Sequence, residues 1–146
     1  MIESLTGKWL GIYIYGAGYE DELRGKTVPF EIEFWEEDSL VKGTCIDEET
    51  RHLFKTPSLI AGTFENGTLI FYKTYPSLYD IDANGEAYII DDAKPPSIQY
   101  TGWVKRKCFS KKLYFQGNWE IHGSFMDEEK RAQYYELEGT WKMKKI

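Results

Sequence analysis

Few residues of this chain belong to the types that enzymes use for proton transfer or nucleophilic attack. The chain contains 2 histidines, His52 beside an expected turn and His122 at the end of "NWEIH", where strand alternation places it on the outer face. No nucleophile motif, phosphate-binding loop or Cys-x-x-Cys pair occurs. The acidic run Asp47, Glu48 and Glu49 has the character of a solvated segment. We therefore expect surface histidines, no catalytic residues and no cofactor.

One segment, "DIDANGEAYIID", has the spacing of a calcium-binding loop. Asp80, Asp82, Asn84 and Gly85 are followed at the twelfth place by Asp91, and calcium prefers several oxygen ligands. The last ligand is nevertheless Asp instead of the usual Glu, and prolines instead of helices flank the segment. Asn84-Gly85 is also typical of a hairpin turn. We predict no metal site, with calcium binding as the alternative.

Noncovalent binding by aromatic side chains is the chemistry that the sequence favours. The chain has 11 Tyr, 8 Phe and 5 Trp. An apolar pocket with a few placed polar groups is the usual small-molecule site, and tyrosine hydroxyls supply such groups. The residues expected to face the interior and bind the ligand are Trp9, Tyr13, Tyr15, Phe30, Phe34, Phe115, Trp119 and Trp141, together with Gly11, Ile32 and Leu137 on the same faces. The alternative is that these side chains simply fill the core and leave no cavity.

The elements that must position these residues are strands, because alternation with period two dominates the chain. In "VPFEIEFWEED", for example, Phe30 and Phe34 share one face while Glu31 and Glu33 share the other. Asn66-Gly67 is typical of a tight hairpin turn, and "YEDELRGK" has room for one helical turn. The expected strands cover 5–16, 27–36, 40–47, 57–65, 68–75, 86–91, 97–106, 111–123 and 132–144, and "YPSLYDIDANG" and "DDAKPPS" are expected to be irregular loops. The sequence predicts an all-β fold with a single domain over residues 1–146, a closed antiparallel up-and-down barrel of eight or nine strands.

A glycine, one spacer and a tryptophan recur in three places, at residues 7–9, 117–119 and 139–141. Residues two apart share a strand face, so the glycine makes room and lets the strand bend while the tryptophan fills the space. All three tryptophans are therefore expected to point into the barrel.

The opening "LTGKW", followed by an all-β chain of this length, resembles the calycin superfamily of lipocalins, fatty-acid-binding proteins and avidins. The mark shared by that superfamily is Gly-x-Trp on the first strand, and the opening looks closest to avidins. The resemblance implies a calycin-like barrel that binds a small molecule in its interior. Biotin binding is not carried over, because "LGIYIYGAGY" stands where the polar residues of that site are expected. The final strand also lacks Arg-x-Tyr.

The outer face of the first strand suggests a different function. Leu10, Ile12 and Ile14 are apolar although they alternate with the inward set, and a strand with one wet face is normally polar there. The alternative function is therefore a closed-core barrel that acts as an oligomerisation or protein-interaction module, for example as a homo-oligomer.

Charge and hydropathy restrict the partners further. The formal net charge is −6 and the basic clusters are short, which argues against a nucleic-acid partner. No stretch is apolar enough to cross a membrane or to resemble a secretory signal, so we expect no membrane partner and a cytoplasmic chain, or a mature form without its signal. Cys45 and Cys108 are too few for a disulfide framework and are expected to be reduced thiols.

Overall fold

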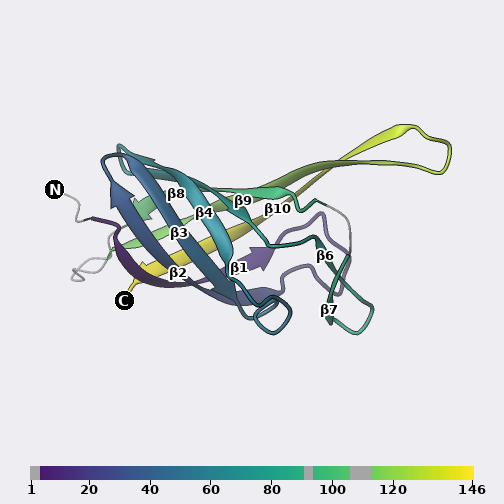
Figure 1. The fold of residues 1–146 in the computed structure, drawn as a ribbon, viewed down its shortest axis with the longest axis horizontal. Coiled ribbons are helices and arrows are strands. Elements are labelled where there is room, and N and C mark those ends of the chain that lie inside the picture. Colours follow the sequence, from purple (N-terminus) through teal and green to yellow (C-terminus); the bar gives the residue numbers. More distant parts are fainter. Residues whose placement is uncertain (1–3, 91–93, 106–112) are drawn as a thin grey trace.

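The fold is a closed β-barrel. The computed structural model describes residues 4–90, 94–105 and 113–146. Within these residues, eight strands form one antiparallel barrel in the order β1-β10-β9-β8-β5-β4-β3-β2, and two short strands form a separate hairpin (Figure 1). The strands are β1 (Gly7–Tyr15), β2 (Thr27–Glu37), β3 (Leu40–Asp47), β4 (Ser58–Glu65), β5 (Thr68–Thr74), β6 (Tyr79–Ile81), β7 (Ala87–Ile89), β8 (Ser97–Lys105), β9 (Tyr114–Met126) and β10 (Ala132–Lys145). The predicted all-β, up-and-down barrel is confirmed.

The strand predicted at 86–91 differs from the structure. Its described part, Ala87–Ile89, pairs with Tyr79–Ile81 outside the barrel, and β5 pairs directly with β8. The segment containing β6 was predicted to be an irregular loop, because three residues are too few to show alternation. The predicted strand ends at 91, 106 and 111 lie outside the described residues.

The turns follow the local sequence. Asn66 and Gly67 have φ angles of 52° and 78°, the two positive values of the type I′ hairpin that Asn-Gly favours. "YEDELRGK" holds a single turn, in which the Arg24 N–H donates to the Glu20 carbonyl. Both predictions are confirmed.

The two ends of the barrel differ. At the end where β1 begins and β10 ends, which we call the closed end, β2 is joined to β3 and β4 to β5 by short turns (Figure 1). At the opposite end, which we call the open end, longer segments at 16–26, 48–57, 75–90 and 94–96 surround the strand ends, and the β9–β10 hairpin projects well beyond the barrel (Figure 1). These longer segments therefore lie around a single barrel mouth.

Two of the Gly-x-Trp segments face each other in neighbouring strands. In the β9–β10 register, Gly117 lies opposite Trp141 and Gly139 lies opposite Trp119. A Cβ added at Gly139 would collide with the Trp119 indole and with the carbonyl oxygen of Ile14. Gly139 thus leaves the space that Trp119 needs, whereas a Cβ added at Gly117 would collide with the backbone of Thr101 and Gly102 in β8. Trp9, Trp119 and Trp141 are only 0%, 3% and 2% exposed, which confirms that all three point inward.

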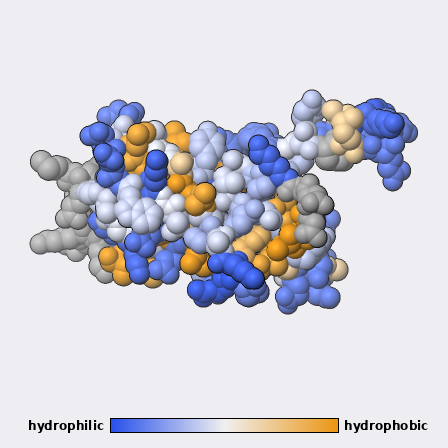
Figure 2. Space-filling view, viewed as in Figure 1, coloured by the Kyte–Doolittle hydropathy of each residue, from blue (hydrophilic) through white to orange (hydrophobic). Residues whose placement is uncertain are grey.

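The outer surface is mixed in character. Leu10 is 42% exposed, and Ile12 and Ile14 are half-buried on the same outer face of β1. On the face shown in Figure 2, apolar side chains form small patches separated by hydrophilic ones, and the tip of the projecting hairpin is hydrophilic. Among the residues that the structure describes, no helix has the length and apolar character needed to span a membrane.

Candidate functional site

The barrel interior is divided into a packed half and a hollow half. Near the closed end, large side chains fill the space: the Trp9 and Phe115 ring centroids are 5.4 Å apart, and those of Phe34 and Phe71 are 5.8 Å apart. Trp141 packs against Phe71 at 5.7 Å. This half of the barrel is a conventional aromatic core.

The open end contains a cavity of about 370 Å³. Its wall combines inward residues of the barrel strands with residues from the segments at 16–26, 75–90 and 94–96. Its wall is largely apolar, with aliphatic residues and prolines beside the aromatic members Tyr13, Tyr15, Tyr19, Tyr75, Tyr79, Tyr100, Trp119 and Tyr135. The volume lies in the range of small-molecule pockets, and eight-stranded barrels are wide enough to hold one small ligand.

A buried ion pair lies beside the cavity. The Lys73 Nζ lies 2.8 Å from Asp47 Oδ2, and both residues are 1% exposed. The Tyr75 hydroxyl donates to the same Asp47 oxygen at 2.6 Å, and the Thr50 backbone N–H donates to Asp47 Oδ1 at 2.8 Å. Burial alone would raise the pKa of Asp47, but the Lys73 ammonium and these hydrogen bonds lower it below its usual value. Burial alone would lower the pKa of Lys73, but the surrounding acidic groups raise it. Both side chains are therefore ionised at neutral pH.

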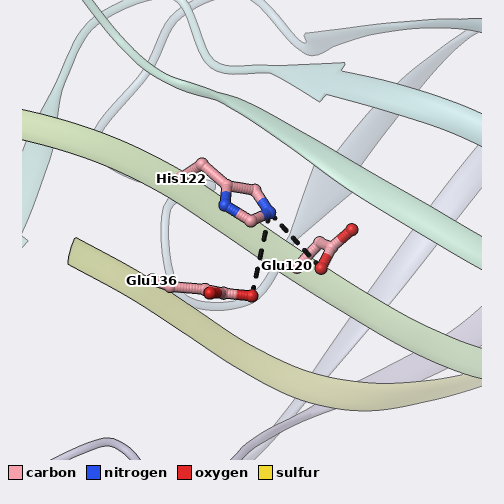
Figure 3. A group of neighbouring side chains, drawn as sticks. All are labelled: Glu120, His122 and Glu136. Carbon is pink, nitrogen blue, oxygen red and sulfur yellow. Dashed lines mark ion pairs between the residues drawn. The ribbon is translucent and has the colours of Figure 1, made fainter. Parts of the chain in front are cut away.

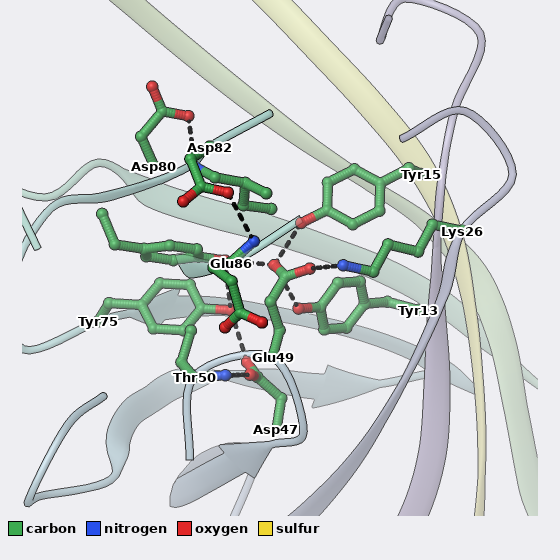
Figure 4. Close-up of polar contacts among 12 residues, drawn as sticks. Tyr13, Tyr15, Lys26, Asp47, Glu49, Thr50, Tyr75, Asp80, Asp82 and Glu86 are labelled. Atoms are coloured by element: carbon green, nitrogen blue, oxygen red, sulfur yellow. Dashed lines mark hydrogen bonds and ion pairs between the residues drawn. The ribbon is translucent and has the colours of Figure 1, made fainter. Parts of the chain in front are cut away.

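A second carboxylate, Glu49, collects several donors at the cavity (Figure 4). Its Oε1 accepts hydrogen bonds from the hydroxyls of Tyr15, of Tyr79 at 2.9 Å and of Tyr13 at 3.3 Å. The Lys26 Nζ lies 3.0 Å from the other oxygen. Burial raises the pKa of all three tyrosines, and the nearby carboxylates raise it further, so their hydroxyls stay protonated as donors.

Strand alternation places these charged groups in the interior. Asp47 is the last inward residue of β3, in phase with Val41 and Cys45. Lys73 is inward on β5, in phase with Phe71 and with Tyr75 just after the strand. The expectation that Asp47 and Glu49 are solvated was wrong, because both are buried and only Glu48 between them is exposed. The alternation of inward and outward residues along β3 could have predicted this burial, because it places Asp47 inward and continues past the strand end to Glu49. Asp47, Glu49 and Lys73 were therefore missed as site residues.

The residues predicted to bind a ligand fall into separate groups. Tyr13, Tyr15 and Trp119 line the cavity. Phe30 is buried and stacks on Tyr13 with a centroid distance of 6.3 Å. The remaining four, Trp9, Phe34, Phe115 and Trp141, are buried core residues outside the cavity lining. Ligand binding by any of them stays a prediction.

Trp119 has an unusual polar atom. Its indole Nε1 is buried and has no hydrogen-bond partner among the residues that the structure describes. Buried polar groups are normally paired, so an isolated donor in a residue of the cavity wall needs an explanation. Three tyrosine rings surround this indole, those of Tyr13, Tyr15 and Tyr19, with centroids 6.4, 6.0 and 5.9 Å away.

A separate polar cluster lies on the outer face of the β9–β10 hairpin (Figure 3). The His122 Nε2 lies 3.3 Å from Glu120 Oε2 and 4.0 Å from Glu136 Oε1. One imidazole nitrogen and two carboxylates are ligands that zinc accepts, but these distances are also those of ordinary surface ion pairs. His122 and His52 are both exposed, as predicted.

The calcium-like segment forms a hairpin turn. Asp82 Oδ1 accepts the backbone N–H groups of Asn84 at 2.8 Å and Glu86 at 3.0 Å, and Gly85 has a φ of 80°. These bonds occupy an oxygen that calcium would need. Asp91, the twelfth residue of the pattern, lies outside the described residues.

No family model matches the chain, and no curated protein and no solved structure is significantly similar to it. The closed antiparallel barrel is compatible with a calycin-like fold. The site itself therefore has to carry the functional argument.

Proposed function

We propose that this protein binds a small, partly apolar or aromatic molecule in the cavity at the open end of the barrel, without catalysing a reaction. The observation that carries the proposal is the division of the interior. Aromatic side chains fill the closed half, whereas the open half keeps about 370 Å³ of space between largely apolar walls. A core that served stability alone would gain from filling that space, because this would remove more apolar surface from water.

The ionisation of the buried groups supports binding over catalysis. A catalytic lysine needs a lowered pKa, but the pKa of Lys73 is raised and its ammonium is paired with Asp47. The pKa of the Cys45 thiol is raised by burial to about 11, which removes its thiolate at neutral pH. Groups that hold their protons in this way are suited to fixing a ligand through hydrogen bonds.

We further propose that the barrel is of the calycin type, on the strength of Gly-x-Trp in β1 and the closed up-and-down topology. A cytoplasmic location and the absence of nucleic-acid or membrane partners stay predictions from the sequence.

The test uses N-phenyl-1-naphthylamine, an apolar fluorescent probe. We expect its fluorescence to rise on binding to the wild-type protein. Leu137→Trp places a larger side chain in the cavity wall and should weaken probe binding by about tenfold or more, since Leu137 lines the cavity. Glu138→Trp is the matched control, because Glu138 is the next residue of β10 and points outward. Equal probe binding by wild type and Leu137→Trp, or none by either, would overturn the proposal.

The second candidate is assembly through the outer face of β1. Leu10 supports it, because it is a large apolar side chain that is 42% exposed beside the partly exposed Ile12 and Ile14. Native mass spectrometry of protein purified gently from its host separates the two functions. An extra mass lost on denaturation supports a ligand, whereas a multiple of the chain mass that Leu10→Lys abolishes supports assembly.

A further inference from the structure

The charge on the cavity lining is negative. Asp80 is the one charged residue among the described lining residues, and none of those residues is basic. Behind the wall lie two carboxylates, Asp47 and Glu49, each already neutralised by a lysine. An anionic ligand would therefore enter the cavity without a positive partner, at a cost in desolvation.

Three tyrosine hydroxyls at the cavity can accept further hydrogen bonds but cannot donate them. A tyrosine hydroxyl has one hydrogen, and those of Tyr13, Tyr15 and Tyr79 are donated to Glu49. What remains on each hydroxyl is the capacity to accept a hydrogen bond. A ligand that offers N–H donors complements such groups, whereas a carboxylate ligand does not.

The aromatic rings of the wall also favour a cationic ligand. The electrons of an aromatic ring attract a cation placed over its face within about 6 Å. The protein already uses this contact, since the Lys73 Nζ lies 4.4 Å from the Tyr75 ring centroid and 5.1 Å from that of Tyr13. A phenol that donates to a carboxylate also carries more negative charge on its ring, which strengthens the attraction.

From these observations we infer that the cavity selects small organic cations, of the class of primary ammonium compounds that carry an aromatic or other apolar group. The inference rests on the proposed function, because it names the class of ligand for the same cavity. The ammonium group lies among the tyrosine rings and accepting hydroxyls, and the apolar group contacts the rest of the wall.

The experiment compares three ligands with the same phenyl ring by isothermal titration calorimetry at neutral pH. 2-Phenylethylamine is a cation, 2-phenylethanol is neutral and 3-phenylpropanoate is an anion. We expect the amine to bind at least about fivefold more tightly than the alcohol, since even a solvent-exposed cation–π contact can have an effect of that size. The anion should bind most weakly. Equal affinities for amine and alcohol, or tighter binding of the anion, would overturn the inference.

Two variants make the source of the preference visible. Tyr135→Leu keeps an apolar wall but removes one aromatic face from the cavity lining, and should lower the amine-to-alcohol affinity ratio. Tyr134→Leu is the matched control, because Tyr134 is the neighbouring residue and is 82% exposed; its ratio should equal that of wild type. An unchanged ratio in Tyr135→Leu, in a variant with a wild-type circular dichroism spectrum, counts against the aromatic faces as the source.

The failure of this inference differs from the failure of the proposed function. If N-phenyl-1-naphthylamine binds but the amine shows no advantage, the cavity binds ligands without selecting cations. If neither the naphthyl probe nor any phenyl compound binds, both the proposed function and the inference fail.

Discussion

Removal of one partner from the buried Asp47–Lys73 pair should have a large effect on stability. In Lys73→Met, a side chain of similar length replaces the ammonium, and the carboxylate of Asp47 stays buried with no counter-ion. Breaking a buried ion pair from one side costs about 3–5 kcal/mol. For a domain of this size, about 1 kcal/mol corresponds to roughly 2–4 °C in Tm, so we expect Tm to fall by roughly 6–20 °C.

The double variant Asp47→Leu/Lys73→Met should be more stable than Lys73→Met, because Asp47 no longer leaves a buried charge without a counter-ion. It should not recover fully, since the Tyr75 hydroxyl loses its acceptor, and a buried unsatisfied group costs about 1–3 kcal/mol. Arg51→Met is the matched control: it breaks an exposed pair with Glu48 of 2.6 Å, which should change stability by less than about 1 kcal/mol.

The assay is urea unfolding at neutral pH, followed by circular dichroism and tryptophan fluorescence. The free energies of unfolding of the two single variants and the double variant form a thermodynamic cycle. The reasoning is refuted if Lys73→Met loses no more than the Arg51→Met control. It is also refuted if the losses of Asp47→Leu and Lys73→Met simply add in the double variant.

Three other predictions address the remaining features of the fold. The cavity tyrosines have raised pKa values, so the native state keeps protons that the unfolded chain releases near about pH 10. Stability should therefore be complete below that pH and fall above it, and absorbance at about 295 nm should show these phenols ionising together with unfolding; ionisation in the folded protein would contradict this. Gly139→Ala should destabilise the protein by about 1–3 kcal/mol in urea unfolding, because its Cβ collides with Trp119 and with the Ile14 carbonyl; a neutral substitution would show that the indole can move aside. In a Cys108→Ser background, Cys45 should react with a thiol reagent only on unfolding, since it is buried and its pKa is raised to about 11; rapid labelling of the folded protein would disprove this.

Much of the barrel could be predicted from sequence because most of its strands alternate between an apolar inward face and a polar outward face. In β2, the alternation of Phe30, Ile32 and Phe34 with Glu31 and Glu33 sets both the strand and its inward face. The Asn66-Gly67 turn fixes the register of the next pair. The β6–β7 hairpin could not be predicted in this way, because its strands have only three residues each and pair outside the barrel sheet.

The charged part of the site was harder to predict for a different reason. A lysine in "FYKTY" has the inward phase, but burial of a charge is unfavourable unless a partner exists. That partner, Asp47, is 26 residues away, so neither residue predicts the other without the fold. The cavity is harder still, because it is the volume that the inward side chains leave unfilled. Strand alternation predicts that both Tyr13 and Trp9 point into the barrel. It does not predict that Tyr13 lines the cavity while Trp9 is packed in the core.

The pairing of β1 with β10 has a consequence for synthesis of the protein. The sheet closes only through this contact, and it joins Trp9 to Lys145 and Tyr13 to Trp141 across nearly the whole length of the chain. During translation, the earlier strands must wait with the free edges of β1 and β9 unpaired until β10 leaves the ribosome. Contacts of such long sequence separation fold slowly, and exposed strand edges recruit other strands. The nascent chain is therefore most vulnerable to misassembly just before its last strand appears, and chaperones that shield strand edges should matter most at that moment.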